Sequence, residues 1–415
     1  MDDNVFLKVI ILTMLLAVAG VGLPVLFEPQ PILVGVLHSQ TGTMAFSERG
    51  VLQATLAAID DVNAHGGVLG RPLKAVIADG ASNEKIFAQQ AEHLLVSDKV
   101  PVIFGGWTSA SRKAMLPVLA AHDGLLFYPV QYEGIEQSAN VIYMGMAPNQ
   151  QLYPALTYMH EHFGKKVLLV GSDYIYPRMA NAIARPLLTG LGATICGEIY
   201  VPLGSQNVDA LVQQVKQCQP DYIVNTVNGD SNLAVFKALR TTEHITPIIS
   251  MSLSETELRH LITFLGIGVT QAHYVSWGYL QSLDTPENRS FVRQLQMTLP
   301  AAAINHPMKV AWDGVHLWAN AANLSGVVDA GVLGKNLAGM SFPSASGVVS
   351  VDISNRHLWQ PVYVAQAQTD GSFAVVWQSR SLVAPNPWPL GKDHAAWQQL
   401  EQDWYQQWGG QWQAP

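Results

Sequence analysis

Short apolar segments alternate with amphipathic segments along most of this chain, and that alternation constrains its fold more than any other feature. Residues 31–39 read PILVGVLHS, and residues 48–65 place apolar side chains at helical spacing before Gly66 and Gly67 end the helix. Strands that are apolar throughout are typical of parallel sheets covered by helices on both faces. We predict strands at residues 31–39, 73–78, 101–104 and 125–130, and a second set at 166–170, 194–201, 222–226 and 247–250.

The two sets of strands predict two α/β lobes rather than one. The chain has 415 residues, whereas single hydrophobic cores stop growing at about 250–300 residues. No short repeat of fixed period runs through the sequence. Each set of strands is therefore expected to form its own doubly wound parallel sheet.

Charge and hydropathy narrow the classes of protein to which the chain can belong. Only 13% of its residues are charged, 49% are hydrophobic, and the formal net charge is −8. Disordered chains combine low hydrophobicity with high charge, so this composition excludes disorder. No run of Lys or Arg is present to cover phosphates, which argues against a nucleic-acid partner. A polytopic membrane protein is also excluded, because a single segment is long and apolar enough to span a bilayer.

That segment lies near the N-terminus, where residues 9–27 carry no charge. Residues 17–19 read AVA, which is a cleavage pattern typical of a signal peptide. The apolar run continues past this point and residues 1–8 are poorly basic, which is typical of an uncleaved anchor instead. We therefore predict that residues 1–30 are a signal peptide or a membrane anchor. Both interpretations place the bulk of the chain outside the cytoplasm.

The chain has two cysteines, Cys196 and Cys218. Cys196 lies at the start of a predicted strand and Cys218 at the end of the helix that follows it. Because such a helix returns toward the start of its strand, a disulfide bond between the two is geometrically feasible. Two free buried thiols are the alternative, and two cysteines do not make a disulfide framework.

The last part of the chain has a different character. Residues 361–368 and 373–378 are predicted to form a hairpin around Asp370-Gly371. Residues 386–415 are predicted to form a tail helix rich in tryptophan. One interpretation is a helix docked on its own lobe, and the other is a contact with a second copy, a partner or a membrane surface. The apolar stripe of this helix consists of Trp397, Leu400, Trp404 and Trp408.

The motifs that mark common enzymes and cofactor sites are absent from the sequence. No GxGxxG follows a predicted strand, and GxxxxGK[ST], HExxH and GxSxG do not occur. His160 and His162 are two positions apart, so they diverge on a helix and cannot chelate one metal ion. We predict no enzymatic activity, no catalytic residue, no metal site and no cofactor.

Polar and aromatic side chains follow several predicted strands, at the edge of a parallel sheet where ligands bind. Ser109 is expected near a helix N-terminus, where its hydroxyl and the local N–H groups are donors for a carbonyl oxygen. Aromatic walls with neutral hydrogen-bonding groups suit a small, planar, uncharged polar ligand. The predicted ligand-binding residues are Trp107, Thr108, Ser109, Tyr128, Val130, Gln131, Tyr174, Tyr176, Asn228, Asp230 and Ser254.

Each of these residues also has a purely structural interpretation. A tyrosine at this edge could pack in a core or form a contact between lobes, and Asp230 could cap the helix that follows it. Arg112, Lys113 and Arg178 lie at the far ends of their loops, so we expect them to form ion pairs on helix surfaces.

Several of these segments together resemble the type I periplasmic substrate-binding proteins, and within them the urea and short-chain amide branch that serves urea ABC transporters. The similarity covers nearly all of the chain after the leader. Related amide-sensing proteins carry Thr-Pro where this chain has Val130-Gln131, and that difference favours the urea transporter group. The matching segments are GVLHSQTGTMA (35–45), NAHGGVLGRPL (63–73), WTSASRK (107–113), YPVQYEG (128–134), GSDY (171–174), NGDSN (228–232) and HLW (357–359).

The resemblance implies an α/β fold of two Rossmann-like lobes with parallel sheets, joined by a three-strand hinge that closes on the ligand. The hinge crossings are expected near residues 143–148, 275–280 and 347–351. The expected division assigns residues 1–30 to the signal peptide or anchor, 31–145 and 281–348 to lobe 1, 146–280 and 349–385 to lobe 2, and 386–415 to the tail helix.

The resemblance also implies a function. We expect an extracytoplasmic solute-binding protein that binds urea or a short-chain amide between its lobes and delivers it to an ABC permease. Ser109 would hold the ligand carbonyl, and Tyr174 and Asp230 would accept hydrogen bonds from its amide groups. The protein would be periplasmic, either exported or anchored to the inner membrane. A sensor coupled to a kinase or antiterminator, a branched-chain amino-acid binder and a homodimer remain open.

Overall fold

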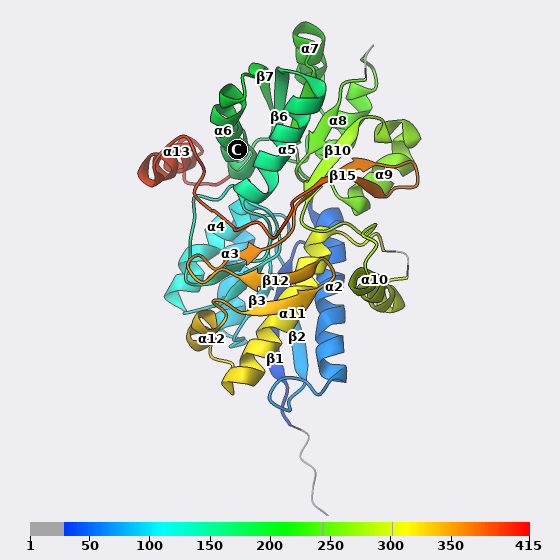
Figure 1. The fold of residues 1–415 in the computed structure, drawn as a ribbon. Coiled ribbons are helices and arrows are strands. Elements are labelled where there is room, and N and C mark those ends of the chain that lie inside the picture. Colours follow the sequence, from blue (N-terminus) through cyan, green and yellow to red (C-terminus); the bar gives the residue numbers. More distant parts are fainter. Residues whose placement is uncertain (1–28, 243–244, 301) are drawn as a thin grey trace, which may run out of the picture.

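The computed structural model describes residues 29–242, 245–300 and 302–415, which form two α/β lobes stacked one above the other (Figure 1). The predicted fold class is confirmed, because each lobe is built around its own mostly or wholly parallel sheet. The predicted leader at residues 1–30 lies almost entirely outside the described residues. In the described part of the chain, no helix is long and apolar enough to cross a membrane.

Lobe 1 is built around a five-stranded parallel sheet. Its strands, in spatial order, are β2 (Leu73–Asp79), β1 (Ile32–His38), β3 (Ile103–Gly105), β4 (Leu126–Tyr128) and β5 (Val141–Tyr143). The helices around it are α2 (Ala45–Ala64), α3 (Glu84–Val96), α4 (Ser109–Ala121) and, from a later part of the chain, α10 (Pro286–Thr298), α11 (His306–Ser325) and α12 (Ala330–Asn336). Strand β1 is buried almost throughout, which explains its continuous apolar sequence.

Lobe 2 is built around a seven-stranded sheet. Its strands, in spatial order, are β15 (Phe373–Gln378), β14 (Tyr363–Ala367), β10 (His273–Trp277), β9 (Ile248–Ser250), β8 (Tyr222–Thr226), β6 (Lys166–Ser172) and β7 (Thr194–Val201). The helices of this lobe are α5 (Pro148–Phe163), α6 (Ile175–Gly190), α7 (Asp209–Cys218), α8 (Ser231–Leu239), α9 (Glu255–Leu265) and the 3-10 helix η1 (Ile267–Thr270). Strands β14 and β15 are antiparallel to their neighbours, and they form the predicted hairpin.

The chain passes between the lobes three times. The first passage follows β5 and the second follows β10, as the resemblance implies. The third lies after β13 (Leu358–Trp359), later than residues 347–351. Val349, Val351 and Leu358 pack in the core of lobe 1 because β11 (Ser341–Ser344), β12 (Gly347–Val351) and β13 form a small antiparallel sheet there.

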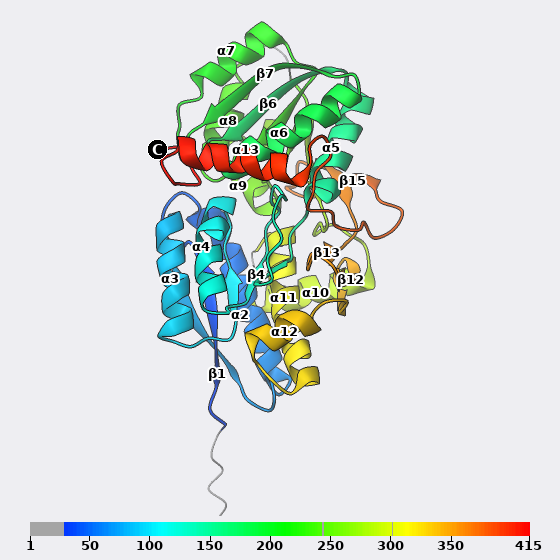
Figure 2. The same ribbon diagram turned by 90° about the vertical axis from the view of Figure 1, so that its left-hand side faces the viewer.

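Helix α13 (His394–Gln407) follows the hairpin and lies along the edge of lobe 2 that faces lobe 1 (Figure 2). Trp397 and Trp408 are buried in the core of lobe 2, in the same cluster as Tyr174. The structure therefore docks the tryptophan-rich helix on its own lobe, which is the first of the two interpretations given by the sequence.

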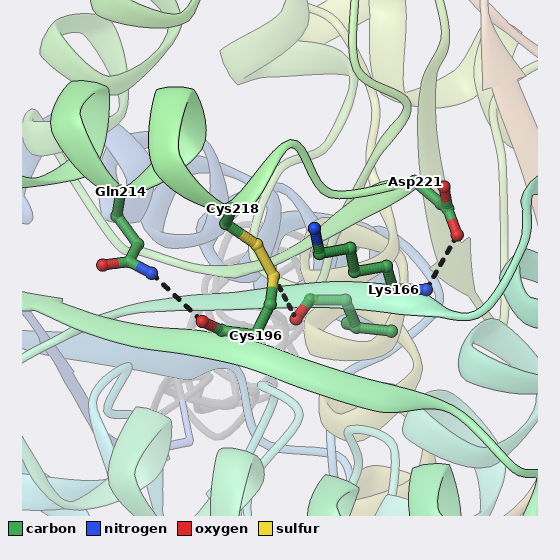
Figure 3. The surroundings of a disulfide bond; sticks show 6 residues. Lys166, Cys196, Gln214, Cys218 and Asp221 are labelled. Carbon is green, nitrogen blue, oxygen red and sulfur yellow. Dashed lines mark hydrogen bonds between the residues drawn. A yellow bond between two sulfur atoms is a disulfide. The ribbon is translucent and has the colours of Figure 1, made fainter.

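Cys196 and Cys218 form a disulfide bond between strand β7 and the end of helix α7 (Figure 3). Their Cα atoms are 5.8 Å apart, a normal separation for a bridged pair. The side-chain amide of Gln214 donates a hydrogen bond to the carbonyl oxygen of Cys196 at 3.1 Å. The bond therefore fastens α7 to the outer edge of the sheet, and the alternative of two free thiols is wrong.

We expect the double substitution Cys196→Ser, Cys218→Ser to lower the free energy of unfolding by about 3 kcal/mol. The two cysteines are separated by 22 residues, and a loop of that length loses roughly this much chain entropy when it is closed. Guanidinium chloride denaturation of the oxidised protein against the variant measures the difference. Equal midpoints for the two proteins would contradict the prediction, and reduced wild-type protein should match the variant.

Candidate ligand-binding site

The carboxyl ends of strands from both lobes meet where the lobes face each other, and a glycine sets the path of the chain after β3. Gly105 has a φ of +152°, and a Cβ atom there would lie 1.9 Å from the carbonyl oxygen of Leu37. Only glycine allows this close approach of β3 to β1. The turn carries the chain directly to Trp107, whose side chain is buried.

Thr108 and Ser109 begin helix α4 with different roles. Thr108 is the N-cap residue, because its hydroxyl oxygen accepts a hydrogen bond from the backbone N–H of Ser111 at 3.1 Å. Ser109 points to a buried carboxylate, and its hydroxyl donates a hydrogen bond to Glu133. The structure thus gives Thr108 a capping role and pairs Ser109 with a buried carboxylate of its own lobe.

A buried cation completes this arrangement around Ser109. Arg112 donates hydrogen bonds to the Ser109 hydroxyl at 3.0 Å and to Glu133 at 2.9 Å. It also donates through Nε to Glu136 at 2.8 Å. Its guanidinium group lies over the rings of Tyr128 and Tyr132, so the cation is enclosed on its faces as well as its edges.

Lys113 extends the cluster toward the tail helix. Its amine lies 3.3 Å from Glu136 and 3.1 Å from Glu401 of α13. Arg112 and Lys113 are 0% and 6% exposed. Both residues form ion pairs, as expected, but these pairs do not lie on a helix surface. They are buried between α4, the residues after β4 and the tail.

The ionisation of this cluster follows from its burial and its pairing. Burial alone would lower the pKa of Arg112, but Glu136 and Glu133 raise it above its usual value. Burial would raise the pKa of Glu136, but Arg112 and Lys113 hold it at about 2. For Glu401, burial outweighs Lys113 and raises the pKa to about 7. Arg112 and Glu136 are thus both charged at neutral pH.

Lobe 2 contributes two aromatic residues that face this cluster. Tyr174 and Tyr176 follow β6, and both side chains are buried. Burial raises the pKa of both phenols, and the neighbouring groups that perturb them include Tyr128 and Glu133 of lobe 1. The predicted aromatic residues of the two lobes therefore lie against each other in one buried region.

Gln131 connects the lobes directly. Its side-chain amide nitrogen donates hydrogen bonds to the Met251 carbonyl at 2.9 Å and to the Ser252 hydroxyl at 3.1 Å, both in the loop after β9. Among the described residues, the indole nitrogen of Trp107 and the amide oxygen of Gln131 are buried without a hydrogen-bond partner. The hydroxyl of Tyr176 lies within hydrogen-bonding reach of the Gln131 and Ser252 side chains.

Unpaired polar atoms in a buried site require a partner, because each one costs about 1–3 kcal/mol. Here they are a pure donor and a pure acceptor. Both belong to residues that the sequence predicted as ligand-binding. A small polar molecule that offers an acceptor and a donor would satisfy them.

The remaining predicted residues form contacts within the protein or lie at its surface. Asn228 is buried, but its side chain donates to the carbonyl of Thr226 at 3.1 Å. Asp230 is exposed, and its side chain makes no capping bond within the described residues. Ser254 caps α9 in a capping box, and its hydroxyl accepts a hydrogen bond from Asn305 of lobe 1 at 3.0 Å. Val130 packs its backbone against Gly145.

The segment after α13 also joins the two lobes. The backbone N–H of Trp412 donates to Glu84 of α3 at 3.0 Å, and the Trp412 carbonyl accepts from Ile175 of lobe 2 at 2.9 Å. The amine of Lys113 lies 5.0 Å from the centroid of the Trp412 ring. We call residues 394–415 the tail strap. Figure 2 shows its helix crossing near the ends of α3 and α4.

Sequence reasoning did not predict Arg112, Glu133, Glu136 and Glu401 as members of this region. Glu133 lies two positions after Gln131, so its location after β4 was a usable signal. Glu401 gave one as well, because it lies four positions after Trp397 and interrupts the apolar stripe of the tail helix with a carboxylate.

Comparison with protein families identifies a match over most of the chain. Residues 32–393 match the family model described as the periplasmic binding protein domain. The Leu/Ile/Val-binding protein homolog 6 of Brucella suis is 23% identical over 357 residues, which cover 82% of this chain and 89% of that protein. A limonene hydroxylase of Geobacillus stearothermophilus is 32% identical over 124 residues, which cover 30% of this chain and 23% of that protein.

Solved structures with the same fold are also similar to this chain. A solute-binding protein of an ABC transporter from R. palustris, in complex with 4-hydroxybenzoate, has a TM-score of 0.77 at 21% identity and covers 88% of this chain and 100% of its own. A branched-chain amino acid transporter substrate-binding protein from Streptococcus pneumoniae, in complex with isoleucine, has a TM-score of 0.71 at 20% identity. The match covers 86% of this chain and 100% of that chain.

Proposed function

Since the chain belongs to the periplasmic binding protein domain family, we propose that it binds urea or a short-chain amide between its lobes and delivers it to an ABC permease. Its relatives are solute-binding proteins of ABC transporters. This family places the protein outside the cytoplasm. The choice of ligand rests on the chemistry of the region between the lobes.

One observation carries the proposal of a neutral ligand, namely that both buried cations of this region are already paired. Arg112 is held by Glu133 and Glu136, and Lys113 by Glu136 and Glu401. A benzoate or an amino acid brings a carboxylate, which needs an unpaired positive charge or a set of free donors. Burying that carboxylate beside three others would be unfavourable.

Urea and short amides match the unpaired groups better. Urea has one carbonyl acceptor and four N–H donors, all in one plane. The Trp107 indole can donate to the carbonyl, while the Gln131 amide oxygen and a Glu133 oxygen can accept from N–H groups. Tyr128, Tyr174 and Tyr176 would pack around such a planar ligand.

The contacts between lobes suggest how binding is communicated. Gln131 of lobe 1 holds the loop after β9 of lobe 2, and it also carries one of the unpaired acceptors. A ligand that bonds to Gln131 from one side and to Tyr176 from the other would stabilise the closed arrangement. Binding then shifts the equilibrium between open and closed forms, and the permease would recognise the closed form.

We expect isothermal titration calorimetry to detect urea or a short amide and not leucine or 4-hydroxybenzoate. Gln131→Leu should weaken amide binding about 5- to 100-fold, because it leaves N–H donors of the ligand unpaired. Gln271→Leu is the control, since Gln271 is exposed on lobe 2, away from this region. Binding of leucine or the benzoate with no heat from any amide would overturn the proposal.

A further inference from the structure

One short segment of lobe 1 reaches several elements of lobe 2. The segment runs from Thr43 to Phe46 and forms the N-terminal end of α2, and in Figure 1 this upper end of α2 lies below lobe 2. It contacts the loop after β7, the loop after β8 and helix α9. We call residues 43–46 the α2 tip.

Two glycines of lobe 2 provide the room that the α2 tip occupies. A Cβ atom on Gly204 would lie 2.5 Å from Cγ2 of Thr43, and one on Gly229 would lie 2.9 Å from the carbonyl oxygen of Thr43. Both separations are shorter than a van der Waals contact, so side chains at these two positions would push the lobes apart. Leu203, which precedes Gly204, packs against the core of lobe 1 as well as that of lobe 2.

The α2 tip also makes an aromatic contact with lobe 2. The ring centroids of Phe46 and His260 are 4.5 Å apart, and Phe264 extends the row of rings with its centroid 4.6 Å from that of His260. Phe46 belongs to lobe 1, whereas the other two rings belong to α9 of lobe 2. Phe46 and Phe264 are 37% and 63% exposed. This contact therefore joins the lobes at the protein surface and not within a core.

The contact between Thr43 and Gly204 lies far from the hinge. The first two passages between the lobes follow β5 and β10. In lobe 1 the α2 tip follows β1, and β3 and β4 separate β1 from β5. In lobe 2 Gly204 follows β7, and β6, β8 and β9 separate β7 from β10. Because the contact has a long lever arm about the hinge, a small opening rotation of the lobes would separate Thr43 from Gly204.

We propose that the α2 tip is a latch that holds the lobes closed, and that Gly204 and Gly229 form the seat that admits it. A ligand between the lobes leaves from the open arrangement, so the latch slows its dissociation. The residues of the latch act by positioning the lobes and need no contact with the ligand. The effect on ligand binding rests on the proposed function, whereas the contact between the lobes does not.

A pair of introduced cysteines tests the contact without any ligand. A Cβ atom on residue 204 would lie 3.5 Å from Cβ of Thr43, which is a separation that disulfide bonds span. The two natural cysteines are bonded to each other, so Thr43→Cys, Gly204→Cys should form a new intramolecular disulfide bond under mild oxidation. Peptide mapping without reduction detects it.

The control pair is Thr43→Cys, Gly192→Cys. No atom of the described chain lies within 4 Å of a Cβ atom on residue 192, so this pair should stay reduced. Equal cross-linking of the two pairs, or none between residues 43 and 204, would overturn the latch.

Gly204→Ala tests the effect of the latch on binding, because it places a methyl group against Thr43. We expect urea binding to weaken about five- to tenfold in calorimetry, since the closed population falls, with most of the loss in faster dissociation. Gly192→Ala is the matched control. Gly192 and Gly204 have φ values of +81° and +82°, so alanine strains the backbone similarly at both, but only residue 204 meets a neighbour. The control should bind urea like the wild type.

Adding Thr43→Ala to Gly204→Ala should restore binding. It removes Cγ2 and leaves the two Cβ atoms 3.5 Å apart, which is an ordinary contact. A general loss of stability at residue 204 would not be repaired in this way. Equal urea affinities for Gly204→Ala and Gly192→Ala, or no rescue by Thr43→Ala, would contradict the proposal. A chain that cross-links between residues 43 and 204 but does not bind urea would overturn the proposed ligand and leave the latch standing.

Discussion

Arg112→Met is expected to lower the free energy of unfolding by about 3–5 kcal/mol, one of the two largest effects anticipated for this protein. The substitution removes the cation that Glu133 and Glu136 share, and it leaves both carboxylates buried without it. Breaking a buried ion pair from one side costs this much because an uncompensated charge remains. Guanidinium chloride is the appropriate denaturant, because urea is the proposed ligand.

Two further variants separate this explanation from a general intolerance of the position. Arg289→Met removes an arginine whose ion pair with Asp284 lies on the surface, and it should cost at most about 1 kcal/mol. Adding Glu133→Gln and Glu136→Gln to Arg112→Met should recover part of the lost stability, because no buried charge is then left unpaired. If the neutralised triple variant is as unstable as Arg112→Met, the loss comes from packing and not from charge.

Ending the chain after Lys392 is expected to weaken ligand binding by tenfold or more and to expand the unliganded protein. The truncation removes the tail strap, including the contacts of Trp412 with Glu84 and of Glu401 with Lys113. Hydrogen bonds to charged groups contribute about 1.5–3 kcal/mol each, and a smaller closed population lowers the apparent affinity in proportion. Small-angle X-ray scattering and calorimetry measure the two effects.

The truncated chain also loses the buried Trp397 and Trp408, so its folding could be affected. The variant Glu84→Ala, Glu401→Gln keeps these tryptophans and removes charged contacts between the strap and lobe 1. It should show a smaller change of the same sign in both measurements. Unchanged affinity and unchanged radius of gyration in a folded double variant would show that the strap does not influence closure.

Much of the fold could be predicted from the sequence because its signals are local. Buried parallel strands read as continuous apolar runs, so β1, β6 and β8 stand out without knowledge of their neighbours. Once the parallel strands are known, the loops that follow them can be located too. These loops lie at one edge of the sheet, because the carboxyl ends of parallel strands meet there. The meeting of Gln131 and Tyr176 could be anticipated for that reason.

The buried charges could not be predicted in this way. Lys113 is buried because Glu136 and Glu401 compensate its charge, and Glu401 lies 288 positions away in the sequence. A short stretch of sequence shows only that Lys113 is a charged residue near the start of a helix. Such residues are usually exposed to solvent, so exposure is what the sequence predicts. The third passage between the lobes was misplaced for a similar reason, since β12 is recognisable as a strand but its antiparallel partners are not.

The order of the chain has a consequence for how the protein is made. Lobe 1 is discontinuous, and its core includes residues from Ile32 to Leu358. The first half of this lobe therefore leaves the ribosome long before the helices and strands that complete it. Closure of the buried charge cluster waits longer still, until Glu401 has been synthesised. In a nascent chain, lobe 1 therefore lacks a finished core until translation is nearly over, which delays the folding of that lobe.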